Sequence, residues 1–148
     1  MPSKRRKPRA RRRQGRAPRF GCGVDVVELP RFRQALARGG EPFMRRIFTV
    51  REAAYARARR KTSLLHLAGR FAAKEAVIKA VSQVNPRRTL AMNQVEVRND
   101  RLGRPSIVLH DQDGRPARRS GRRHRRLQVH ISLSHVDTVA VASAIVIQ

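Results

Sequence analysis

Apolar and polar positions alternate most regularly near the C-terminal end of the chain, where residues 127–134 predict a strand with one buried face. Residues 94–98 alternate in the same way, and the turn candidate at 99–103 returns the chain into a second strand. Short apolar runs predict the remaining strands. The expected strands are residues 21–27, 94–98, 105–110, 127–134 and 138–147.

Between the first and second of these strands the apolar positions recur with a helical period. The longest helical pattern, residues 63–82, has a broad apolar stripe. Residues 49–52 have the spacing of a capping box and should open a helix that ends near residue 60. An earlier helix should begin at Pro30 and stop at the glycine pair 39–40, with a short helical piece after Pro42. The order of strand, helices, strand pair and strand pair predicts an α+β domain with a mostly antiparallel sheet packed against the long helix.

Charge is distributed unevenly along the 148 residues, whose net charge is +25. Residues 1–19 hold ten Lys or Arg and no acid, and residues 115–126 hold seven Arg and no acid. The first segment reads as a disordered basic arm and residues 20–148 as one domain. When both segments are left out, the net charge of the remaining residues is still +8. Such a surface attracts anions, among them nucleic acids, phosphorylated ligands and acidic proteins.

The compartment is predicted from two simple features. Cys22 is the single cysteine, so a disulfide framework is excluded and a reducing compartment is favoured. No apolar stretch approaches 18 residues, which argues against a membrane span. We therefore expect a cytoplasmic protein.

Two carboxylates in apolar surroundings are the first candidates for chemistry. Asp25 lies within a valine-rich strand and Glu75 lies on or near the apolar face of the long helix. Brought together they would suit Mg²⁺, which prefers oxygen ligands and keeps waters or substrate phosphates in its other positions. In the alternative interpretation, which spacing alone favours, Asp25 caps the next helix and Glu75 pairs with Lys79.

Three cationic or polar side chains are further candidates. Lys74 and Lys79 are suited to phosphate oxygens, although spacing alone favours a solvated helix face for both. His135 follows a strand and is suited to an anion or a ligand hydroxyl, although a lone histidine is more often only a turn residue.

Three segments, taken in order, are more specific than any single residue. Residues 23–29 (GVDVVEL), 69–80 (GRFAAKEAVIKA) and 131–135 (ISLSH) resemble the signature segments of the holo-acyl-carrier-protein synthases, the small trimeric type of 4'-phosphopantetheinyl transferase. Residues 48–52 (FTVRE) and 99–105 (NDRLGRP) support the resemblance, which covers residues 21–148.

The resemblance implies a 4'-phosphopantetheinyl transferase-like fold and a defined reaction. Such an enzyme transfers 4'-phosphopantetheine from coenzyme A to a serine of apo-acyl carrier protein, in fatty acid or polyketide biosynthesis. The serine attacks the β-phosphate and 3',5'-ADP leaves. By resemblance Asp25 and Glu75 hold Mg²⁺ on the pyrophosphate, and the serine proton goes either to a metal-bound water or to Glu75.

Further roles are implied by matching positions. The catalytic residues are expected to be Asp25, Glu75, Lys79 and His135, and the coenzyme A-binding residues Arg70, Lys74, Lys79, Pro105 and His135. Arg31 and Arg38 are expected to dock the acidic recognition helix of the carrier protein. A homotrimer is implied, with the active site between subunits and Pro105 contributed by the neighbour.

The chain departs from the family pattern in two segments. Residues 81–88 lack the glycine of the usual loop near the nucleotide, and residues 115–126 read as a basic loop where a helix is usual.

The rival to the transferase function is that of a basic nucleic-acid-binding protein, which the two basic segments favour. Six Phe and Tyr residues, none interleaved with the basic runs, offer no base-stacking platform. We expect polyanion binding only as an accessory property of the arm.

Overall fold

The structure, a computed structural model, describes residues 17–117 and 127–148. Almost all of the expected arm and most of the expected basic loop lie outside the described residues. Its elements are β1 (Phe20–Glu28), α1 (Leu29–Ile47), α2 (Val50–Arg57), α3 (Ser63–Val84), β2 (Val95–Asn99), β3 (Pro105–Leu109), β4 (Gln128–His135) and β5 (Val139–Ile147), with short 3-10 turns at Arg60–Thr62 and Met92–Gln94. All five strands and the long helix therefore form where the hydrophobic pattern predicts them.

Two expected helix boundaries are also found. The capping box at the start of α2 is complete, with the Thr49 side chain accepting from the Glu52 backbone N–H and the Glu52 side chain accepting from the Thr49 N–H. The glycine pair interrupts α1, because Gly40 has φ 54° and ψ −150° and so breaks the helical path. The helix resumes around Pro42, as expected for a separate short piece.

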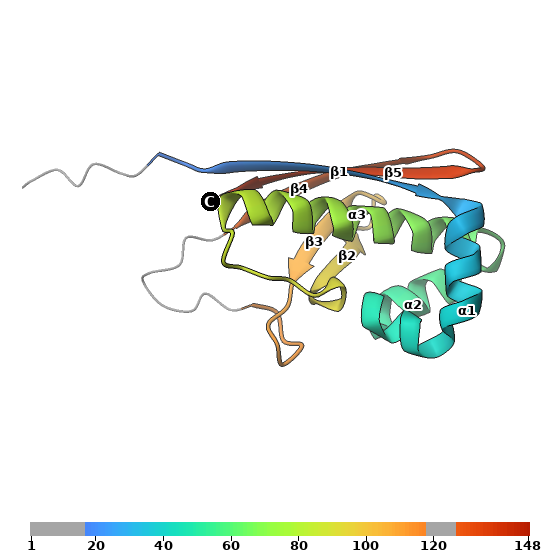
Figure 1. The fold of residues 1–148 in the computed structure, drawn as a ribbon. Helices are drawn as coiled ribbons and strands as arrows, with labels where there is room; N and C mark the ends of the chain where they lie inside the picture. The colour runs from blue at the N-terminus through green and yellow to red at the C-terminus, as the bar shows by residue number, and fades with distance from the viewer. Residues whose placement is uncertain (1–16, 118–126) are drawn as a thin grey trace, which may run out of the picture.

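The strands form two antiparallel sheets and not one. Strands β1, β5 and β4 make a three-stranded sheet in that order, and β2 and β3 make a hairpin. The three-stranded sheet covers one side of α3, and α1, α2 and the hairpin lie on the other side (Figure 1). The expectation of antiparallel strands packed on the long helix is confirmed. No helix among the described residues combines the length and apolar character needed to cross a membrane.

Close contact between β1 and α3 depends on two glycines. A Cβ atom on Gly21 would lie 2.1 Å from the Ala80 carbonyl oxygen, and one on Gly23 would lie 2.0 Å from that of Ala76. The buried alanines of α3 make the same approach possible from the helix side. The strand that bears Asp25 is thus held directly on the helix that bears Glu75.

Helix side chains also cover the free backbone edge of β1. The Gln83 amide accepts from the Cys22 N–H at 3.0 Å and donates to the Cys22 carbonyl at 2.6 Å. The Lys79 ammonium donates to the Val24 carbonyl at 3.1 Å. Backbone groups that β5 does not pair are therefore satisfied from α3.

Replacing Gly23 by alanine should destabilise the protein by about 3 kcal/mol, because the new methyl group must push β1 away from the α3 backbone. Urea denaturation followed by circular dichroism measures the loss. Gly69→Ala is the matched control, since its Cβ would meet only Leu133 Cδ2 at 3.9 Å and alanine is the better helix former. Equal stability of the two variants would refute the close-packing argument.

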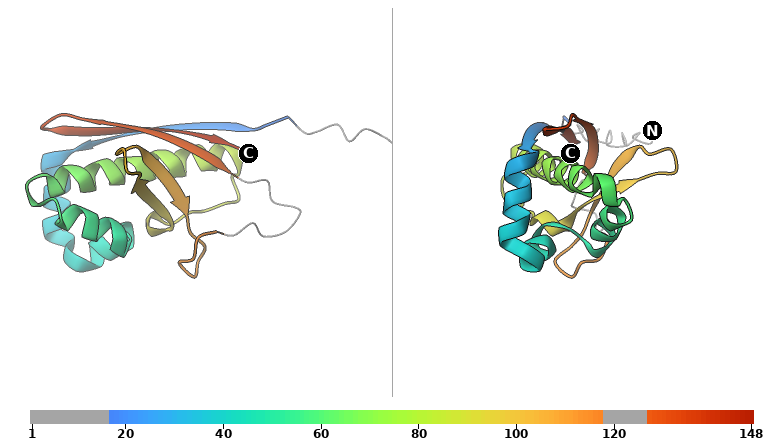
Figure 2. Two further views of the ribbon diagram at one scale, coloured as in Figure 1. Left: turned by 180° about the vertical axis from the view of Figure 1, so that it is seen from behind. Right: turned by 90° about the vertical axis from the view of Figure 1, so that its right-hand side faces the viewer.

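On β1 and β5, the sheet face that points away from α3 carries exposed apolar side chains. Alternation along β1 and β5 places on it Phe20, Val24, Val26 and Ile145, each more than half exposed. None of the described elements covers this face in either orientation (Figure 2). An exposed apolar face of this kind usually marks an interaction surface.

Candidate functional site

The first group of predicted site residues meets where β1 crosses α3. The Lys79 ammonium lies 2.8 Å from Asp25 Oδ1, with Asp25 mostly buried and Lys79 half exposed. The hydrogen bond with Asp25 raises the pKa of Lys79, and the charges of Asp25 and Glu75 act in the same direction. Glu75 precedes Lys79 by one helical turn and is partly buried. Asp25, Glu75 and Lys79 therefore form one cluster, here called the carboxylate edge.

Neither alternative interpretation of these acids describes the structure. Glu28 and not Asp25 is the N-cap residue of α1, and it makes no side-chain capping bond. Lys79 forms its ion pair with Asp25 and not with Glu75.

The carboxylate edge fits a magnesium ion that completes its coordination with substrate. In residues 17–117 and 127–148 no group of three or more His, Cys, Asp or Glu side chains comes together as a metal site. Two carboxylates are nevertheless enough for Mg²⁺, which is commonly held by one or two carboxylates together with phosphates and waters.

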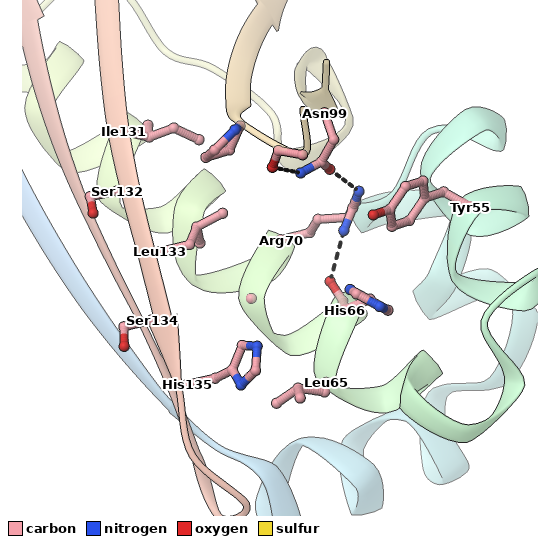
Figure 3. Close-up of a pocket in the computed structure, with 13 residues that line it drawn as sticks. Tyr55, Leu65, His66, Arg70, Asn99, Ile131, Ser132, Leu133, Ser134 and His135 are labelled. Atoms are coloured by element: carbon pink, nitrogen blue, oxygen red, sulfur yellow. Dashed lines mark hydrogen bonds between the residues drawn. The ribbon is translucent and has the colours of Figure 1, made fainter. Parts of the chain in front are cut away.

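The second group of predicted residues lines a pocket of about 390 Å³ between α2, the start of α3, the β2–β3 turn and β4 (Figure 3). Its lining includes Tyr55, His66, Arg70, Asn99, Pro105 and His135. Arg70, Pro105 and His135 were predicted as coenzyme A-binding residues, and the structure places all three at this one pocket.

Arg70 is the charged centre of this pocket. Its guanidinium donates to Asn99 Oδ1 at 2.8 Å and to the His66 carbonyl at 3.3 Å, and lies 4.0 Å from the centre of the Tyr55 ring. Burial lowers the pKa of Arg70, and the neighbouring Arg70 charge adds to burial in lowering the pKa of His66. Arg70 Nε is buried without a hydrogen-bond partner among the described residues. The pocket is therefore suited to an anionic group that carries an apolar or aromatic portion.

Lys74 is placed at neither cluster. Its side chain is fully buried, and its ammonium donates to Glu52 Oε2, the Ile47 carbonyl and the Met92 carbonyl. All three protons are used inside the protein, so none is left for a phosphate. The structure replaces both earlier interpretations of Lys74, as a phosphate ligand and as a solvated side chain, with a core ion pair.

The carboxylate edge and the pocket lie on different sides of α3. Arg70 and Lys79 are nine residues apart, which in an α-helix corresponds to about 180° of rotation and about 13 Å along the axis. Strand β5 also separates β1, which carries Asp25, from β4, which carries His135. The two sets of predicted residues therefore do not meet within one chain.

The remaining predicted residues lie on the surface of α1. Arg31 and Arg38 are both exposed, and Arg31 lies 4.0 Å from Glu28. Tyr55 and His66 were not predicted, because a single tyrosine and a lone histidine give no pattern. Asn99 was recognised only as part of a turn motif.

The chain resembles known proteins over most of its length. Residues 21–138 match the family model described as the 4'-phosphopantetheinyl transferase superfamily. The holo-[acyl-carrier-protein] synthase of Koribacter versatilis is 36% identical over 126 residues, which is 85% of this chain and 96% of that protein.

Solved structures show the same likeness. The holo-(acyl-carrier-protein) synthase of Bacillus anthracis, solved with CoA (3',5'-ADP), has 31% identity and a TM-score of 0.65 over 86% of this chain and 96% of that one. An ACPS-CoA complex from Chronobacterium ammoniagenes has 29% identity and a TM-score of 0.69 over 86% and 96% of the two chains.

Proposed function

The chain belongs to the 4'-phosphopantetheinyl transferase superfamily, and from this premise we propose that it acts as a holo-[acyl-carrier-protein] synthase. It transfers 4'-phosphopantetheine from coenzyme A to a serine of apo-acyl carrier protein and releases 3',5'-ADP. The observation that carries the proposal is likeness to enzymes of this name across 85% of the chain, with the two carboxylates of the signature segments gathered around one lysine.

In the carboxylate edge, Asp25 and Glu75 would hold Mg²⁺, and Lys79 would bind a phosphate oxygen of coenzyme A. The bound ion would neutralise charge on the pyrophosphate. Lys79 already has a raised pKa from its bond with Asp25, so it stays cationic when an anion arrives. Phosphoryl transfer depends mainly on positioning and charge stabilisation, which these side chains supply.

In the pocket, Arg70, Pro105 and His135 would hold the nucleotide portion of coenzyme A. Arg70 supplies the positive charge that a phosphate group requires, and Pro105 and Leu133 supply apolar surface in the same pocket. Lys74 has no part in this binding, for the reason given above.

Assembly of subunits would bring the two clusters together. Since the carboxylate edge and the pocket face different sides of α3, a complete site requires the edge of one chain and the pocket of a neighbour. The exposed apolar side chains of β1 and β5 on the outer sheet face support association of copies. A homotrimer, expected from the family resemblance, provides three such sites.

The other parts of the chain have proposed roles outside the chemistry. Arg31 and Arg38, both exposed on α1, would dock the acidic carrier protein. Residues 20–148 form the single catalytic domain, and the basic segment 1–19 would bind polyanions without contributing to transfer. A cytoplasmic location is consistent with the carrier-protein substrate.

Incubation with coenzyme A, Mg²⁺ and an apo-acyl carrier protein should add one phosphopantetheine group to the carrier, measured by intact mass. A chelator should abolish the addition and fresh Mg²⁺ should restore it. Deleting residues 1–19 should leave the rate unchanged. A carrier protein whose acceptor serine is replaced by alanine is the control. No mass gain with several carrier proteins would refute the proposed function.

A further inference from the structure

A fully buried ion pair joins α2 to α3. The side chains of Glu52 and Lys74 both have no exposed surface, and Lys74 Nζ lies 2.7 Å from Glu52 Oε2. The other two Lys74 protons go to the carbonyl oxygens of Ile47, at 2.7 Å, and Met92, at 3.0 Å. Lys74 thus has one oxygen partner for each of the three protons of an ammonium group.

The carboxylate is satisfied as completely as the ammonium. Glu52 Oε2 also accepts from the Thr49 N–H at 2.9 Å, and Oε1 accepts from the Val97 N–H at 2.9 Å. The Thr49 and Val97 N–H groups and the Lys74 side chain therefore occupy both carboxylate oxygens of Glu52. Five short bonds thus connect the end of α1, the start of α2, α3, the 3-10 turn at Met92–Gln94 and β2.

Each of three connected elements carries a pocket residue close to the pair. Tyr55 follows Glu52 by three residues on α2, and Arg70 precedes Lys74 by four on α3. Asn99 follows Val97 by two on β2. Residues three or four apart share a helix face, and residues two apart share a strand face. The ion pair therefore sets the spacing of the elements from which the Tyr55–Arg70–Asn99 contacts are built.

Stability alone does not account for such a pair. Replacing a buried ion pair by apolar side chains of similar volume is often neutral or stabilising, because the desolvation of two charges offsets much of their attraction. Directional bonds to backbone groups fix the relative position of elements in a way that apolar contacts do not. The bonds from Glu52 and Lys74 end on backbone groups of Ile47, Thr49, Met92 and Val97.

We propose that Glu52 and Lys74 are positioning residues that hold α2, α3 and β2 so that Arg70 is aimed into the pocket. This role rests on the proposed function, in which the pocket holds the nucleotide portion of coenzyme A. The pair touches neither the pocket interior nor the carboxylate edge. Its loss weakens coenzyme A binding and leaves the chemical step largely intact.

The double variant Glu52→Gln/Lys74→Met removes both charges at once, so no unpaired charge stays buried. We expect the KM for coenzyme A to rise about tenfold, with kcat within about twofold of the parent protein. Glu52→Asp keeps the charge next to Lys74 and only shortens the side chain, so it should fold if the double variant does not and should give a smaller rise in KM. Thr49→Ala is the matched control, since it removes the cap bond to the Glu52 N–H and lowers stability while both charged side chains stay in place, and its KM should not change.

A purely structural role predicts the opposite kinetic pattern. Loss of folded protein would lower the apparent kcat in proportion and leave KM unchanged, and this result in both variants would overturn the proposal.

A second readout does not depend on transferase activity. Tyr55 is the only tyrosine of a chain without tryptophan, so tyrosine fluorescence reports this pocket wall alone. The folded Glu52→Asp variant should show altered Tyr55 emission, because the Arg70 guanidinium moves relative to the ring. Unchanged emission would overturn the positioning role. Failure of the parent protein to modify any carrier protein would refute the proposed function, and the Tyr55 measurement would still decide whether the pair positions the pocket.

Discussion

Glu75→Gln should lower the transfer rate by about a hundredfold or more, because the amide removes a negative charge from the carboxylate edge and weakens Mg²⁺ binding there. Asp25→Asn should have an effect of similar size, with the added loss of the charged partner of Lys79. Phosphopantetheine transfer to a carrier protein, followed by intact mass under single-turnover conditions, measures both. Neither acid is fully buried, so both variants should fold.

The matched control for these variants is Glu41→Gln. Glu41 is an exposed acid on α1 that makes a 3.7 Å contact with Arg45 on the same helix, so its loss should not change the rate. Titration with Mg²⁺ separates a weakened metal site from lost chemistry, since a weakened site recovers part of its rate at high Mg²⁺. If Glu75→Gln transferred phosphopantetheine at the rate of the parent protein at moderate Mg²⁺, the assignment of the metal ligands would be wrong.

Two inactive variants should regain activity when they assemble together. Glu75→Gln damages only the carboxylate edge, and His135→Ala damages only the pocket. If the site forms between neighbouring subunits, random co-assembly leaves about one quarter of the sites with an intact edge from one chain and an intact pocket from the other. Co-expression of the two chains, purification of the mixed oligomer and assay per subunit measure the recovery.

Co-expression of Asp25→Asn with Glu75→Gln provides the control. Both substitutions damage the same cluster, so no interface in a mixed oligomer combines two intact halves. Recovery by the first pair and not by the second would place the edge and the pocket on different subunits. No recovery by the first pair, in oligomers shown by native mass spectrometry to be mixed, would mean that one chain supplies both halves.

Local sequence patterns were sufficient for most of the secondary structure. The strand that bears Asp25 and the helix that bears Glu75 are both visible as runs of apolar residues with a regular period. The break at Gly40 follows from its missing side chain, and the cap at Thr49 from its spacing to Glu52. Each of these signals is contained within a few neighbouring residues.

Features that depend on distant parts of the chain were beyond such patterns. Lys74 lies between alanines and a glutamate in a sequence that equally suits an exposed lysine. Its burial is decided by acceptors 18 to 27 residues away, at Met92, Glu52 and Ile47. The contact of Gly23 with Ala76 likewise spans two elements. Division of the strands into two sheets depends on which strands pair, and alternation cannot show this.

The covered edge of β1 limits how copies of this protein can associate. Gln83 and Lys79 occupy backbone groups that an added strand would need, so another chain cannot extend the sheet at Cys22 and Val24. The apolar outer face remains open to contact. Growth into a continuous ribbon is therefore blocked along this strand, and association of copies is directed to the outer face.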